Sequence, residues 1–104
     1  MRPGNTYTPR NWVVLEITYD GETIRKVFGG WLGGFSTGDS WKLSSGITSV
    51  EEFDDYFEFT NVSGSIYVCY KDKQQMSLYQ ATLLTGWQEA LRDSEKTPIS
   101  IVEF

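Results

Sequence analysis

Residues 29–46 combine the residue types that bind small anionic ligands. Six of the ten glycines fall in these eighteen residues, interleaved with three aromatic residues and a row of hydroxyls. Glycine permits left-handed backbone angles and close backbone approach, and indoles supply rigid stacking area. A phosphate needs several N–H and O–H donors within about 3 Å, and a base needs a π-face. We therefore predict an ordered loop or a pair of irregular strands that carries a ligand site.

The predicted ligand-binding residues supply stacking surfaces, hydroxyl donors and charge. They are Arg25, Trp31, Ser36, Thr37, Asp39, Ser40, Trp41, Lys42, Ser44 and Ser45. The segment is not a Walker loop, because it lacks the Lys-Ser/Thr ending and a following helix. The alternative is that the glycines serve bulges and turns, while Trp31, Phe35 and Trp41 belong to the core.

A second cluster places five carboxylates in eight residues at a predicted hairpin tip. They are Glu51, Glu52, Asp54, Asp55 and Glu58. This acidic tip would meet Lys and Arg of a partner protein, or it would simply keep a turn solvated. A glycosidase-type pair is disfavoured, because nothing at an exposed turn raises the pKa of one carboxyl group.

The composition argues against an enzyme. Histidine is absent, which removes Ser-His-Asp and Cys-His nucleophiles and the usual zinc and haem ligands. Cys69 therefore has no histidine to activate it, and we expect a small, inert, buried side chain. We predict a binding module with no catalytic residue, cofactor or metal.

Length and charge limit the remaining classes. The chain has 104 residues, the size of one domain, and a formal net charge of −5 that disfavours direct nucleic-acid binding. One cysteine allows no intrachain disulfide, and the first residues have no signal-peptide pattern. No apolar run approaches the roughly twenty residues of a membrane span. We expect a soluble cytoplasmic protein without a membrane partner.

The expected architecture begins with a polar extended arm at residues 1–11, followed by a single domain at residues 12–104. Asp20-Gly21 favours a two-residue turn between strands at residues 13–19 and 22–28. That turn pairs Val13 with Phe28 on an apolar core face and Glu16 with Arg25 on a solvated face.

Further strands are predicted at residues 47–53, 56–60 and 65–70. A two-residue loop at Ser63-Gly64 would pair Phe59 with Val68 and Phe57 with Tyr70. The opposite face, with Tyr56, Glu58, Tyr67 and Cys69, would be half polar and partly wet.

A helix is expected from the capping-box pair Ser77 and Gln80, with an apolar stripe through Leu84 and Trp87. Gly86 interrupts it, and close packing of helix on sheet is the usual reason. A terminal strand follows at residues 99–104. The predicted fold class is α+β, a curled antiparallel β-meander of five to six strands packed on one C-terminal helix.

Residues 29–47 read G-G-W-x-G-G-F-x-x-G-D-S-W-K-L-S-S-G-I, followed by G-S-I-Y-V-C-Y-K at residues 64–71 and Q-M at residues 75–76. This pattern resembles small uncharacterised accessory proteins of tailed phages. The resemblance implies a non-enzymatic inhibitor of host defence in the cytoplasm of the host cell. Such a protein would sequester a nucleotide-derived signal.

The alternative is a protein–protein inhibitor, anti-CRISPR-like or another defence-complex blocker, acting through its acidic hairpin or aromatic loop. The chain also has four Trp, six Tyr and six Phe residues. This is more aromatic surface than one helix and one small sheet cover, so we expect a homo-oligomer that uses aromatics of residues 29–46.

Overall fold

A computed structural model describes residues 5–19, 21–31, 40–91 and 98–104. These residues form eight strands, one short 3-10 helix and one α-helix, which confirms the predicted α+β class. In chain order the elements are β1 (Thr6–Tyr7), β2 (Asn11–Tyr19), β3 (Glu22–Trp31), β4 (Ser40–Leu43), β5 (Ile47–Glu52), β6 (Tyr56–Asn61), β7 (Ile66–Tyr70), η1 (Lys71–Lys73), α1 (Leu78–Ala90) and β8 (Ile99–Val102).

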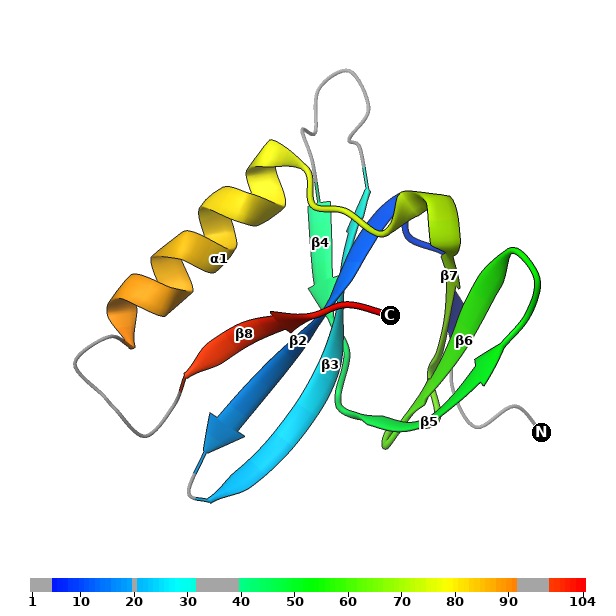
Figure 1. The fold of residues 1–104 in the computed structure, drawn as a ribbon, viewed down its shortest axis with the longest axis horizontal. Coiled ribbons are helices and arrows are strands. Elements are labelled where there is room, and N and C mark those ends of the chain that lie inside the picture. Colours follow the sequence, from blue (N-terminus) through cyan, green and yellow to red (C-terminus); the bar gives the residue numbers. More distant parts are fainter. Residues whose placement is uncertain (1–4, 20, 32–39, 92–97) are drawn as a thin grey trace.

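The strands form two four-stranded sheets instead of the single meander that we predicted. Sheet A has the order β1-β7-β6-β5, and sheet B has the order β4-β3-β2-β8. Two non-local pairings create this arrangement: β1 runs parallel to β7, and β8 returns from the helix to pair with β2. Figure 1 shows β2 and β3 in the middle of the molecule, with α1 on one side and the β5–β6 hairpin on the other.

Both faces of the β2–β3 hairpin are buried in the half away from its turn, because sheet B there lies between α1 and sheet A. Val13, Leu15 and Phe28 pack with Leu84 of the helix. On the opposite face a second core is formed by Trp12, Val14, Val27, Phe57, Phe59, Tyr67 and Cys69. The predicted solvated face of the hairpin is therefore polar only toward the turn.

The β2–β3 hairpin has the predicted register. Val13 pairs with Phe28, and Glu16 pairs with Arg25. Gly21 adopts a φ of +80°, as the two-residue turn requires. The Arg25 Nε atom lies 3.0 Å from Glu16 Oε2, which confirms the predicted cross-strand ion pair.

The register predicted for the β6–β7 hairpin is wrong by one residue. Phe59 pairs with Tyr67 and Phe57 pairs with Cys69, because three residues separate Asn61 from Ser65 in the turn. Gly64 has a φ of +89°, the left-handed position that closes such a three-residue loop. Tyr67 and Cys69 therefore face the inter-sheet core and are not on a partly wet face.

The capping box at the start of α1 is confirmed. The Ser77 hydroxyl accepts a hydrogen bond from the Gln80 backbone N–H, and Gln80 Oε1 accepts one from the Ser77 backbone N–H. Gln80 is fully buried and also donates from Nε2 to the Phe28 carbonyl oxygen at 3.1 Å. One side chain therefore both caps the helix and fastens it to β3.

The expected packing reason for Gly86 is wrong. A Cβ atom built at Gly86 would meet nothing within 4 Å, and the residue is exposed. We expect Gly86→Ala to stabilise the protein by about 1 kcal/mol, because alanine loses less backbone entropy in a helix. Chemical denaturation of both proteins checks this, and equal or lower stability of the variant would contradict it.

Candidate functional site

Two adjoining hollows meet at Lys42 of β4 and Tyr7 of β1. The serine hollow, about 290 Å³, is lined by Lys42 and by hydroxyls of Ser44, Ser45, Ser63, Ser65, Tyr7 and Tyr67. The indole hollow, about 460 Å³, lies between β1 and the strands β3 and β4, and includes Trp31 and Ser40. Lys42 and Tyr7 line both hollows, so one ligand of moderate size can reach into each.

Lys42 supplies the charge at this place. Its Nζ atom lies 5.1 Å from the centre of the Tyr7 ring, a cation–π distance. The ion pairs in the described part of the chain join Arg25 to Glu16 and Lys71 to Glu52, and neither involves Lys42. No Asp or Glu of the described residues lines either hollow.

The serine hydroxyls are held in a short network between two turns. Ser45 donates to the Ser63 hydroxyl at 3.1 Å and accepts from the Ser63 backbone N–H. Ser63 and Ser65 share a further hydrogen bond of 3.1 Å. Ser44 is buried, and its oxygen accepts from the Val27 N–H at 2.8 Å. These bonds fix the oxygens on one wall before any ligand arrives.

Burial raises the pKa of Tyr67 to about 12, with smaller contributions from Tyr7 and Cys69. The Tyr67 phenol therefore stays protonated at neutral pH and acts as a hydrogen-bond donor. Its ring packs against that of Tyr7, with the two centres 5.0 Å apart. The wall of the serine hollow thus combines neutral donors with one ammonium group.

The structure brings together six of the ten predicted ligand residues near Lys42, namely Trp31, Ser40, Trp41, Lys42, Ser44 and Ser45. Arg25 lies elsewhere, in a groove between the two sheets, where it pairs with Glu16. Ser36, Thr37 and Asp39, like Phe35, lie outside the described residues.

The two predicted stacking indoles are on opposite faces of sheet B. Gly30 pairs with Trp41 and Trp31 pairs with Ser40, so the side chains of Trp31 and Trp41 alternate. Trp31 contacts Tyr7, whereas Trp41 packs against Phe28 and Trp87 on the helix side. A bound base can therefore stack on one of them only. The core alternative applies more to Trp31, which is partly buried and packs against the inter-sheet core, whereas Trp41 is 39% exposed.

Sequence reasoning missed several residues of the serine hollow: Asn5, Tyr7, Ser63, Ser65 and Tyr67. The serine-rich turn at residues 61–65 was a usable signal. The position of β1 beside the hollow could not be predicted, because a two-residue parallel pairing with β7 leaves no pattern in the sequence.

No protein-family model, curated protein or solved structure matches the chain. The site must therefore be interpreted from its own geometry. Both helices in the described residues fall short of the length and apolar character of a membrane span.

The acidic tip is a separate surface. Glu51, Glu52, Asp54 and Asp55 are exposed, and Glu58 is half-buried directly opposite Glu51. Like charges in direct cross-strand contact destabilise a sheet. Glu52 is compensated by Lys71, whose Nζ lies 2.7 Å from its carboxylate. No group of acidic residues in the described ranges has the geometry of a metal site.

Cys69 is fully buried in the inter-sheet core, and burial raises the pKa of its thiol. The unfolded chain therefore loses this proton at lower pH than the folded protein, so stability falls as pH rises above about 8.5. We expect the stability difference between wild type and Cys69→Ala to shrink by about 2 kcal/mol between pH 8.5 and 10. Urea denaturation across this range checks it. Parallel pH profiles of the two proteins would contradict the expected linkage.

Proposed function

We propose that this protein is a non-enzymatic binding protein that sequesters a small anionic ligand in the serine hollow. One observation carries the proposal. In a protein with a net charge of −5, the charged side chain in the described lining of this hollow is a lysine without a carboxylate partner, surrounded by hydroxyls. Clustered donors of this kind stabilise an anion even when the distant net charge is negative, because salt screens charges beyond about 8 Å.

The Ser44 hydroxyl has a proton to donate, whereas the proton of Ser45 is already directed to Ser63. A serine oxygen that accepts a bond from a backbone N–H, as Ser44 does from Val27, keeps its own proton for another acceptor. Charge-assisted hydrogen bonds from Lys42 would be stronger than those from the neutral hydroxyls. A phosphate or carboxylate group matches this combination of donors.

The indole hollow favours a nucleotide-derived ligand over a bare anion. It lies on the other side of Lys42 and Tyr7 and includes Trp31. The Trp31 indole is held in place, since its Nε1 donates to the Thr8 carbonyl oxygen at 3.2 Å. A base near this ring would leave its phosphate within reach of Lys42.

The biological context that we propose is phage anti-defence, in which removal of a nucleotide signal would silence a host response. Its support is the resemblance of residues 29–47 to tailed-phage accessory proteins. Lys42, Ser44 and Ser45 lie within that segment and line the serine hollow.

We expect Lys42→Met to weaken binding of a nucleotide ligand by about 10- to 100-fold, the usual effect of losing a charge-assisted hydrogen bond. A thermal-shift screen with linear and cyclic nucleotides and with inorganic phosphate would find the ligand. At a hundredfold excess over Kd, binding adds about 2.7 kcal/mol to the free energy of unfolding.

Lys73→Met is the matched control, because Lys73 is an exposed lysine on η1 outside both hollows. It should leave the thermal shift unchanged. If no anion in the screen raises the melting temperature, or if both lysine variants lose the shift equally, the proposal is wrong.

A further inference from the structure

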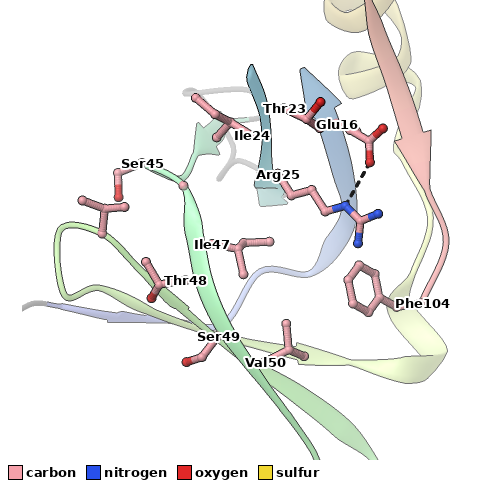
Figure 2. Close-up of a pocket in the computed structure, with 12 residues that line it drawn as sticks. Glu16, Thr23, Ile24, Arg25, Ser45, Ile47, Thr48, Ser49, Val50 and Phe104 are labelled. Carbon is pink, nitrogen blue, oxygen red and sulfur yellow. Dashed lines mark hydrogen bonds and ion pairs between the residues drawn. The ribbon is translucent and has the colours of Figure 1, made fainter. Parts of the chain in front are cut away.

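A hollow of about 540 Å³ lies between the two sheets and separates two strand edges that have no paired strand in the described residues (Figure 2). We propose that this inter-sheet groove receives an extended segment of a partner protein, which adds as a strand to the β5 edge. Its apolar side chains would enter the groove, and its Lys or Arg side chains would meet the acidic tip. Among the described lining residues, this surface shares only Ser45 with the serine hollow.

The first edge belongs to β3. The strand β4 pairs with Phe28 to Trp31, so within the described residues the earlier part of β3 has no strand on that side. In the hairpin, Glu22 and Ile24 direct their backbone groups toward β2. Thr23 and Arg25 direct theirs outward, and both residues line the groove.

The second edge belongs to β5, the last strand of sheet A. The Phe53 N–H donates to the Tyr56 carbonyl oxygen, which fixes the alternation along the β5–β6 ladder. Val50 and Glu52 then direct their backbone groups away from β6. Six successive residues, 45–50, line the groove, so it borders the backbone edge as well as alternate side chains.

The groove is also where exposed apolar side chains gather. Ile24, Val50, Val62 and Phe104 are 41%, 42%, 74% and 38% exposed, and all four line it. Figure 2 shows Ile47 and Val50 on the side of β5 that faces Phe104. Main-chain pairing gives affinity in strand addition, and pockets for alternate side chains give specificity.

The negative charge beside β5 favours a basic partner segment over a second copy of this chain. The acidic tip continues directly from β5, and Glu51 already faces Glu58 across the ladder. Pairing of β5 with the β5 of a second copy would bring two acidic strands together, which is unfavourable. A segment with basic residues at the same place would relieve the repulsion.

The probe is a displayed library of random linear peptides, selected on the full-length protein. Enriched peptides should alternate apolar residues and end in Lys or Arg. Val50→Pro should weaken their binding by about tenfold or more, because proline removes an outward N–H and blocks strand addition. This N–H does not pair with β6, so the substitution spares the ladder of sheet A.

Glu51→Lys tests the charge term without touching the backbone, and it should weaken the same peptides and reduce their salt dependence. Leu78→Ala removes another exposed apolar side chain, on α1, and should change nothing. Lys42→Met should also leave peptide binding intact, which separates this surface from the serine hollow.

Failure to enrich peptides would overturn the proposal. Enriched peptides whose binding is unaffected by both Val50→Pro and Glu51→Lys would overturn it too. Self-association that Val50→Pro abolishes would overturn it as well, by making a second copy the occupant.

Discussion

Gly30→Ala is expected to lower the free energy of unfolding by about 2 to 4 kcal/mol, through overpacking and damage to a helix cap. A Cβ atom at Gly30 would lie 2.6 Å from the Cδ and Oε1 atoms of Gln80. A long side chain would usually move aside. Gln80 is fully buried and bonded to Phe28 and Ser77, so any movement breaks the link between α1 and β3.

A double-mutant cycle separates this contact from a general intolerance of the strand. Gln80→Ala alone should be destabilising, because it removes the capping box and the bond to Phe28. In that background Gly30→Ala should cost little, since the atoms it would strike are gone. Urea denaturation of the four proteins measures the coupling. Additive effects of the two substitutions would contradict this account.

Local signals made part of the fold predictable. Asp20-Gly21 set the register of the β2–β3 hairpin, and Ser77 with Gln80 set the start of α1. In each case the residues that determine the structure are neighbours in the sequence. The turn at residues 61–65 shows the limit of such signals, because one additional loop residue exchanges the two faces of a strand.

The second sheet was not predictable, because its defining contacts are distant in sequence. Thr6 pairs with Ile66, and Val14 pairs with Val102. Val14 and Trp12 alternate with apolar neighbours on β2, a pattern that also fits a strand buried on both faces. The ion pair of Glu16 with Arg25 made that hairpin face appear solvated along its whole length.

The candidate site was predictable in composition and not in geometry. Residues 40–45 contribute side chains to the hollows at Lys42, as their types suggested. The chain separates Arg25 from them and turns Trp31 and Trp41 to opposite faces. Arg25 is separated by its distance along β3, whereas strand alternation turns the two indoles apart, and both results become visible only when β4 is placed against β3.

Trp12→Ala is expected to destabilise the protein by about 3 to 5 kcal/mol, a large part of the 5 to 15 kcal/mol typical of a domain. Trp12 is fully buried and lies between the sheets, with its ring centre 6.1 Å from Phe57 and 5.6 Å from Phe59. Its Nε1 donates to the Tyr70 carbonyl oxygen at 2.7 Å. It therefore joins sheet B to sheet A both by packing and by a hydrogen bond.

Two further variants separate the contributions of packing and hydrogen bonding to the destabilisation by Trp12→Ala. Trp12→Phe keeps most of the packing and should cost less than Trp12→Ala, the remainder reflecting the lost bond to Tyr70. Trp41→Ala removes an indole that is 39% exposed and should also cost less, because it leaves a smaller buried cavity.

Hydrogen exchange of Trp12→Ala should show lost protection in sheet A before the β2–β3 hairpin, which retains its own register and the packing of Val13 and Leu15 against α1. Uniform loss of protection across both sheets would instead show that they unfold as one unit.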